Sequence, residues 1–325
     1  MNSAFAFALY TILCFFALSP ALPISLPSQQ NVRGANSGSF TFFLLGDWGG
    51  QTDAPYTTKI QLDVAKQMIK KAGSLGFAPI VISVGDNFYK HGLPGDISSD
   101  DTQTRFTETF QKVYPGDSLG NDWYLVPGNH DYEGNLDALL AYHNYDSRWN
   151  FPSLNYTFTL DTDAGSVQFV MIDTIKWCDQ GFADQSIAWV EGVLASSTAD
   201  WIFAVGHYPV YSAGHNGPYS DLISGLKPLL EKYNVIAYLS GHDHVMQHID
   251  VGSSVQYIGS GSGMEYSTST KHEKDLPSGS LKYLGGKNGG FGVVTLDGSA
   301  QSMQVDFING KGNTKYTMTA SNPKA

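Results

Sequence analysis

The sequence predicts an α/β sandwich, in which β-sheets pack against each other and helices cover them from outside. From Ser39 onward, short apolar runs typical of buried strands alternate with stretches in which apolar residues recur at helical spacing. After Gly241 this alternation gives way to strand-like runs separated by glycine-rich turns. Strand and helix alternation followed by further strands is typical of layered sheets with helices on the outside.

The individual elements follow from these patterns in chain order. Apolar runs predict strands at Phe40–Leu45, Ile80–Val84, Trp123–Val126, Val167–Ile172, Trp201–Val205, Val235–Leu239, Val255–Ile258, Phe291–Leu296 and Met303–Ile308. Helical periodicity predicts helices at Thr57–Ala72, Thr104–Val113, Asn135–Tyr145, Asp184–Leu194 and Tyr219–Tyr233. In the first helix, an apolar face is formed by Ile60, Val64, Met68 and Ala72. The segment Gly259–Gly290 is rich in Gly, Ser and Lys, and we expect loops there.

The composition is that of a protein with a large core and an acidic surface. Of 325 residues, 42% are hydrophobic, and the formal net charge is -11. Because nucleic acids and anionic lipids are bound mainly through Lys and Arg contacts to phosphate, we expect neither as a partner. An anionic substrate would need a local positive site, which a bound metal ion would provide.

The N-terminal segment has the features of an export signal. Residues 1–28 carry no charged side chain, and Phe5–Leu18 is an apolar run followed by Ser19-Pro20-Ala21. This run is shorter than the roughly 20 residues that a membrane-spanning helix needs. We expect a signal peptide over residues 1–21, with its end no later than about residue 28, and the alternative is a buried N-terminal helix. A leader over residues 22–38 and a single domain over residues 39–320 would follow, in a protein that is secreted or delivered to a lysosomal or vacuolar lumen.

Cysteine usage and one sequon add to this picture. Cys14 lies in the expected signal peptide, so the mature chain keeps only Cys178 and has no intramolecular disulfide. We expect a monomer, and an intermolecular disulfide through Cys178 is the alternative. The triplet Asn155-Tyr156-Thr157 is an N-glycosylation sequon and predicts a glycoprotein.

Five short polar clusters, each opened by glycine, follow apolar runs. In chain order they are Gly46-Asp47-Trp48-Gly49, Gly85-Asp86-Asn87-Phe88-Tyr89, Gly128-Asn129-His130-Asp131, Gly206-His207-Tyr208-Pro209 and Gly241-His242-Asp243-His244. Loops at the carboxyl ends of strands are where α/β proteins place their sites. A single Gly-Asp after a strand is usually only a turn, but turn formation does not explain five such clusters in one chain. Together they predict a functional site.

The side chains of these clusters are metal donors. Oxygen and imidazole donors, with no thiolate among them, come from Asp47, Asp86, Asn129, His207, His242 and His244. This mixture suits Fe, Mn or Zn and argues against a structural zinc bound by cysteines. If the last cluster is extended, the rings of His242 and His244 face one side and Asp243 faces the other. Each histidine alone could equally be an ordinary hydrogen-bonded residue, so the prediction depends on the whole set.

In this order, the five clusters resemble the metal-binding blocks of the purple acid phosphatases, a branch of the calcineurin-like metallophosphoesterases. The resemblance is to the small, tartrate-resistant class, and it extends to Val126-Pro127 before the third cluster and to Gly289-Gly290-Phe291-Gly292. It covers essentially the whole mature chain. It implies a metallophosphoesterase four-layer α/β/β/α sandwich of two mixed sheets flanked by helices, and acid phosphatase activity on phosphate monoesters.

The resemblance also implies a binuclear centre and its ligands. The trivalent iron would be bound by Asp47, Tyr89 and His244. A divalent ion (Fe, Zn or Mn) would be bound by Asn129, His207 and His242, and the carboxylate bridging both metals would be that of Asp86. The tyrosine favours iron over two zinc or manganese ions, because phenolate-to-iron charge transfer gives these enzymes their purple colour.

Two further histidines match the substrate pocket of the family. His130 and His215 would hold the phosphate and protonate the leaving group, while a hydroxide bridging the metals attacks phosphorus. Substrates would be small phosphate monoesters, phosphoproteins or nucleotides. Two alternatives use the same residues: a phosphodiesterase or nucleotide hydrolase, and a metal-binding protein without catalysis.

Overall fold

The computed structural model describes residues 38–120 and 122–325. The expected signal peptide and all but the last residue of the expected leader therefore lie outside the described residues. In the described ranges, no helix is long and apolar enough to cross a membrane.

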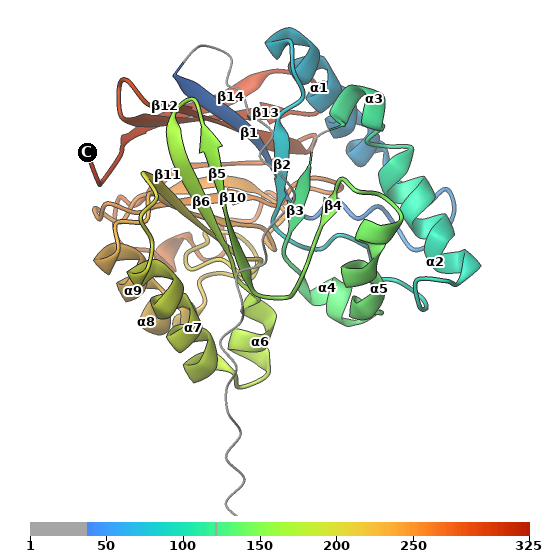
Figure 1. Ribbon diagram of the computed structural model, residues 1–325, viewed down its shortest axis with the longest axis horizontal. Helices are drawn as coiled ribbons and strands as arrows, with labels where there is room; N and C mark the ends of the chain where they lie inside the picture. Colours follow the sequence, from blue (N-terminus) through green and yellow to red (C-terminus); the bar gives the residue numbers. More distant parts are fainter. Residues whose placement is uncertain (1–37, 121) are drawn as a thin grey trace, which may run out of the picture.

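Two mixed sheets of 7 strands each lie face to face in the middle of the molecule, as Figure 1 shows. The first sheet has the spatial order β14 (Thr314–Ser321), β13 (Ser302–Asn309), β12 (Gly290–Asp297), β1 (Ser39–Leu45), β2 (Ile80–Ser83), β3 (Trp123–Leu125) and β4 (Trp149–Asn150). Its strands β1 to β4 are parallel, whereas β12 to β14 are antiparallel hairpin strands added at the β1 edge. The amino-terminal and carboxyl-terminal parts of the chain thus share one sheet.

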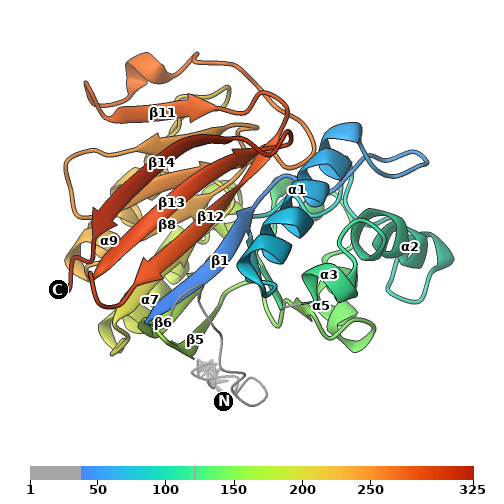
Figure 2. The same cartoon turned by 90° about the horizontal axis from the view of Figure 1, so that it is seen from above.

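The second sheet is built in a similar way from the middle of the chain. Its order is β11 (Leu281–Gly285), β9 (Met246–Ile249), β10 (Gln256–Ser260), β8 (Ala237–Ser240), β7 (Trp201–Val205), β6 (Gly165–Met171) and β5 (Tyr156–Thr162). The strands β6, β7, β8 and β10 are parallel, and antiparallel strands close both edges. Figure 2 shows β12 to β14 lying over β8 of the second sheet.

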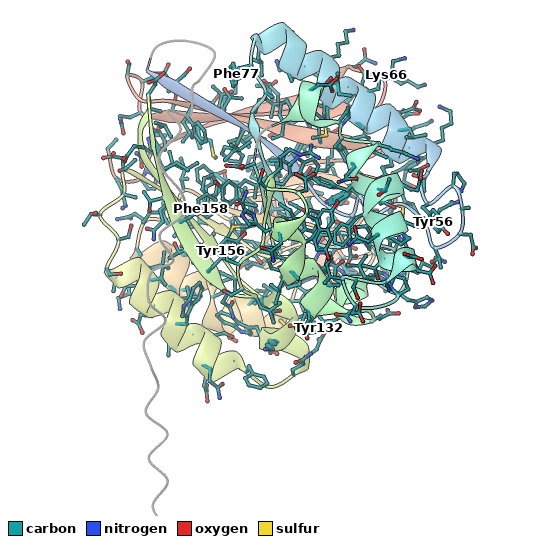
Figure 3. The ribbon with its side chains drawn as sticks, turned by 45° about the vertical axis from the view of Figure 1, so that its right-hand side comes forward. Tyr56, Lys66, Phe77, Tyr132, Tyr156 and Phe158 are labelled. Atoms are coloured by element: carbon teal, nitrogen blue, oxygen red, sulfur yellow. The ribbon has the colours of Figure 1, made fainter. Side chains whose placement is uncertain are left out.

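Aromatic side chains fill the space between the two sheets. Phe42 of β1 meets Phe169 of β6 and Phe203 of β7 edge to face, with ring centroids 5.2 Å apart in each pair. Figure 3 shows Tyr156 and Phe158 of β5 in the same interior, whereas Lys66 points away from it. Edge-to-face aromatic pairs add to the stabilisation from burial alone.

Helices cover the outer faces of both sheets. The first sheet is flanked by α1 (Lys59–Leu75), α2 (Asp100–Arg105), α3 (Gly116–Leu119), α4 (Asn129–Tyr132) and α5 (Leu136–Ala141). The second sheet is covered by α6 (Thr174–Asp179), α7 (Ala183–Ala195), α8 (Ser220–Gly225) and α9 (Lys227–Lys232). Along β7, Phe203 joins the core between the sheets and Ala204 joins the core under the helices, so the strand reads as a continuous apolar run. The predicted four-layer sandwich is confirmed.

Three sequence predictions need correction. The expected helix Tyr219–Tyr233 is two helices, because Pro228 has no N–H to continue the hydrogen bonding of α8. The expected helix Thr104–Val113 continues α2 as a π-helix over Phe106–Gln111. The expected loop Gly259–Gly290 contains β11, which pairs with β9.

Strands β4, β5, β9 and β14 were not predicted. In β14 only Met318 is buried, so the apolar run that would reveal the strand is missing. The strand forms because its main chain pairs with β13 along its whole length.

Candidate metal centre

The five glycine-led clusters meet where the two sheets present the carboxyl ends of their parallel strands. Hydrogen bonds between main-chain groups connect the loops: Gly46 N–H donates to Ser260 O at 2.8 Å, and Asp47 N–H donates to Gly85 O at 3.0 Å. The backbone N–H of His242 donates to both carboxylate oxygens of Asp47, at 3.1 and 2.9 Å. These bonds bring segments far apart in sequence to one place.

A first group of side chains gathers around the hydroxyl of Tyr89. Its Oη atom lies 3.0 Å from Asp47 Oδ1, 2.8 Å from Asp86 Oδ2 and 3.1 Å from His244 Nε2. Both carboxylates are buried, as is the tyrosine. The phenol, the two buried carboxylates and the imidazole together offer oxygen and nitrogen donors. Such donors suit a trivalent or borderline metal ion.

A second group lies on the other side of Asp86. His207 Nε2 is 3.4 Å from Asp86 Oδ2 and 3.1 Å from Asn129 Oδ1. The rings of His207 and His242 lie edge to face with centroids 5.1 Å apart. Donor atoms of Asp47, Asp86 and His207 all lie within 4.8 Å of one another. The predicted ligands therefore form two groups, with the Asp86 carboxylate between them.

Close approach of the backbone makes two of the leading glycines necessary. A Cβ atom on Gly128 would lie 2.1 Å from Asp86 Oδ1, and one on Gly241 would lie 2.4 Å from Asp47 Oδ2. Asp47, Asp86 and His242 themselves have positive φ angles of 54°, 52° and 70°, an uncommon conformation for residues with a side chain. The backbone is thus shaped around the carboxylates.

The last cluster differs from its expected geometry. The segment around His242 is a turn and not an extended strand, so the alternation argument does not apply to it. Both histidines nevertheless reach the site, and Asp243 faces away, as predicted. Its buried carboxylate accepts hydrogen bonds from Ser212 Oγ and from Asn216 N–H, the latter at 2.8 Å. Asp243 thus fixes the loop that carries His215.

The two predicted substrate histidines lie in different surroundings. The N–H of His130 donates to Asp86 Oδ1 at 3.0 Å, and its ring lies 4.7 Å from that of Tyr89. Its side chain is 29% exposed, so it borders both the ligands and solvent. His215 is exposed, and within the described residues its side chain makes no hydrogen bond to a predicted ligand. The structure therefore places His130 beside Asp86 and Tyr89 but leaves His215 on the surface, and the catalytic roles of both stay predictions.

Two residues that the sequence analysis did not single out support the site. The buried carboxylate of Asp131 accepts hydrogen bonds from the N–H groups of Asn87, Phe88 and Gly128. The buried guanidinium of Arg105 donates to Tyr89 O at 2.8 Å. Asp131 belongs to the third cluster and could have been suspected, whereas no sequence pattern marks Arg105.

The electrostatics of the metal-free site depend on the charged pair of Asp86 and His207. Burial disfavours the charged forms of both side chains, but their mutual attraction outweighs it. This attraction lowers the pKa of Asp86 and raises the pKa of His207 to about 9. Burial and the nearby His207 lower the pKa of His242 to about 3, so this second imidazole stays neutral.

These shifts predict a pH dependence of stability for the metal-free protein. Since the pKa of His207 is raised from 6.5 to about 9, its stabilisation is complete below pH 6.5 and is lost as the pH rises through 9. Between pH 6.5 and about 9, the free energy of unfolding should fall by about 3 kcal/mol. Urea unfolding with a chelator present measures this change. The variant His207→Gln should lack this fall. An equal fall in the variant would contradict the assignment.

The sandwich of two mixed sheets, with polar clusters behind its parallel strands, is the fold of a class of phosphoesterases. Residues 40–246 match the family model of the calcineurin-like phosphoesterases, and the chain belongs to that family. Its relatives include tartrate-resistant acid phosphatases of type 5 and purple acid phosphatases, in agreement with the resemblance seen in the sequence.

Three relatives illustrate how far the similarity extends. Tartrate-resistant acid phosphatase type 5 of Sus scrofa is 34% identical, with 94% of each chain covered. The Homo sapiens protein of the same name is 35% identical, covering 85% of this chain and 89% of that protein. Purple acid phosphatase 4 of Arabidopsis thaliana is 34% identical, covering 78% of this chain and 76% of that protein. The prediction of an acid phosphatase is confirmed at the level of the family.

Solved structures show the same fold at lower sequence identity. GAP50, the anchor in the inner membrane complex of Plasmodium, superposes with a TM-score of 0.73 at 24% identity, covering 87% of this chain and 89% of that chain. The purple acid phosphatase PPD1 of yellow lupin (Lupinus luteus) seeds gives a TM-score of 0.63 at 16% identity, covering 89% of this chain and 55% of that chain.

Proposed function

We propose that this acid phosphatase hydrolyses phosphate monoesters at a binuclear centre that contains trivalent iron and a divalent ion. The observation that carries the proposal is the position of the Tyr89 hydroxyl, which contacts Asp47, Asp86 and His244 at 2.8 to 3.1 Å. These contacts support an iron site made by Asp47, Tyr89 and His244. The contacts of His207 with Asn129 and His242 support a second site, with Asp86 shared between the two.

The residues fit such a pair of ions in charge as well as in donor type. Burying the carboxylates of Asp47 and Asp86 side by side is unfavourable unless positive charge lies close to them. When bound, the metal ions would supply that charge, stabilise the oxygens of the phosphoryl group and lower the pKa of a water molecule. Local positive charge would also attract an anionic substrate to a protein whose formal net charge is -11.

The chain itself contributes orientation and a proton donor. His207 Nδ1 lies 2.8 Å from Val84 O, which orients Nε2 toward the site. His130 Nδ1 contacts Lys90 O, which leaves its Nε2 for the substrate. An imidazole at the open side of the centre is suitable for protonating an alkoxide as it leaves. His215 is the second candidate for this role, from a loop held by Asp243.

We further propose that the protein is secreted, or delivered to a lysosomal or vacuolar lumen, and that it is a monomer glycosylated at Asn155. Asn155 is partly exposed and directly precedes β5. An acidic compartment would suit a trivalent iron bound by Asp47, Tyr89 and His244, since a trivalent ion would lower the pKa of a bound water further than a divalent ion would.

The visible absorption spectrum and the metal content of the purified protein test this proposal. A purple band with one iron and one further ion per chain is expected, together with faster turnover of p-nitrophenyl phosphate than of bis(p-nitrophenyl) phosphate. Tyr89→Phe should abolish the band, since the phenolate is its source. Tyr257→Phe is the matched control, because the buried Tyr257 hydroxyl has no hydrogen-bond partner in the described ranges.

A colourless protein with two zinc or manganese ions would reject the iron site. Preference for the diester would favour a phosphodiesterase that uses the same residues. Full metal content without turnover of either ester would favour a metal-binding protein without catalysis.

A further inference from the structure

A tyrosine outside the predicted ligand set contacts one of the candidate metal ligands. The hydroxyl oxygen of Tyr219 lies 2.9 Å from Nε2 of His242, within hydrogen-bond distance. The two rings lie edge to face with centroids 5.7 Å apart. Tyr219 precedes α8, twenty-three residues before His242 along the chain. None of the five glycine-led clusters contains it.

The position of Tyr219 is fixed by its neighbours. Its ring stacks on that of Tyr208, with centroids 4.2 Å apart and an angle of 13° between the planes. Tyr208 is itself held at both ends: its hydroxyl donates to Asp179 Oδ2 at 2.7 Å, and its N–H donates to Thr174 Oγ1 at 2.9 Å. Both of these partners belong to α6. Stacking on the anchored Tyr208 ring therefore fixes the ring of Tyr219 and directs its hydroxyl toward His242.

A histidine has two ring nitrogens, and the partner of one decides which is free to bind a metal. With Nε2 of His242 in contact with Tyr219, Nδ1 remains for the site. His207 is oriented in the opposite sense, since its Nδ1 lies 2.8 Å from the main-chain oxygen of Val84 and its Nε2 faces the ligands. A side-chain substitution cannot remove that main-chain partner, whereas it can remove the hydroxyl of Tyr219.

We propose that Tyr219 is a positioning residue that fixes the ring orientation and tautomer of His242 and thereby sets the affinity of the divalent ion. This inference rests on the proposed function, because it assigns His242 to that ion. In this arrangement the neutral ring carries its proton on Nε2, and the Nε2–H group donates a hydrogen bond to the Tyr219 oxygen. The proposed iron ligands Asp47, Tyr89 and His244 make no such contact with Tyr219 in the described part of the chain. The loss of metal affinity should therefore be confined to the divalent site.

The test uses the whole protein, stripped of metal, reconstituted with one equivalent of Fe(III) and titrated with Co(II). Bound Co(II), counted by elemental analysis after equilibrium dialysis, reports the second site, and the tyrosinate–iron band reports the first. Tyr219→Phe keeps the ring and its stacking on Tyr208, and it should weaken Co(II) binding by about 10- to 100-fold while the iron band persists. Tyr257→Phe, the matched loss of a buried hydroxyl, should bind Co(II) as wild type does.

The possible outcomes separate the positioning role of Tyr219 from the proposed function. Co(II) affinity of Tyr219→Phe within twofold of wild type would overturn the positioning role and leave the proposed function intact. Equal weakening of iron and cobalt would overturn the restriction to one site. A wild-type protein that binds no second ion would reject the binuclear centre itself.

A second measurement does not depend on how the variant folds. In the wild-type protein reconstituted with zinc at both sites, nitrogen–proton correlation spectra should place the proton of His242 on Nε2. A proton on Nδ1 would overturn the inference.

Discussion

Replacing Asp86 with alanine is expected to lower kcat/KM for p-nitrophenyl phosphate by on the order of 10³-fold or more. Its Oδ2 atom lies 2.8 Å from Tyr89 Oη and 3.4 Å from His207 Nε2, so the carboxylate contacts both donor groups. Its Oδ1 accepts the N–H of His130 at 3.0 Å. Loss of the side chain would remove the shared ligand and release the loop that carries His130.

The experiment compares activity and metal content in the same preparation. Asp86→Ala should retain well under two ions per chain and show a similar far-ultraviolet circular dichroism spectrum. Asp63→Ala is the matched control, because Asp63 lies on the surface of α1 and pairs with Lys59 at 2.6 Å. Wild-type turnover by Asp86→Ala at full metal content would contradict the assignment of the bridging ligand.

Replacing His130 with alanine is expected to slow hydrolysis of alkyl phosphates by about 10²-fold or more, because general acid catalysis contributes this much to such reactions. The effect on p-nitrophenyl phosphate should be much smaller, since p-nitrophenolate leaves without protonation. Lys90 O and Asp86 Oδ1 hold the residue at its side chain and its main chain. Because the proton is transferred in the transition state, kcat should fall more than KM rises.

The leaving-group series separates this role from simple phosphate binding. If His130 only binds phosphate, the substitution will affect both substrates equally. His272→Ala is the control, because the His272 ring pairs with Asp275, with Nδ1 2.7 Å from Oδ2, and forms no hydrogen bond to a predicted ligand within the described residues. The variant His215→Ala in the same series tests whether the exposed second histidine shares the proton transfer.

Much of the fold was predictable because each inner strand is a short, continuous run of apolar residues in the sequence. Trp201–Val205 was predicted with its observed bounds, since five buried residues in a row leave a continuous apolar signal. The strand β14 gives no such signal, because seven of its eight residues are not buried. The helix expected over Tyr219–Tyr233 shows a second limit, since one proline interrupts an otherwise continuous apolar pattern.

The donor set was likewise a property of the sequence. Each ligand candidate stands at a fixed place in a cluster behind a strand, and its chemistry follows from the residue type alone. The order of the five clusters was enough to predict the class of enzyme, and the family comparison confirms that class. What the sequence determined by itself was therefore which donor side chains follow which strands, and which class of enzyme they indicate.

Only the tertiary structure decided how those side chains are grouped and held. Tyr89 and His244 are 155 residues apart, and His242 and Asp47 are 195 residues apart, yet each pair is in hydrogen-bond contact. Contacts at such separations depend on how β1, β2, β7 and β8 pair and stack, which no local propensity encodes. The turn at His242, the hydroxyl of Tyr219 beside it and the outward position of His215 arise in the same way, because each is set by neighbours from another part of the chain.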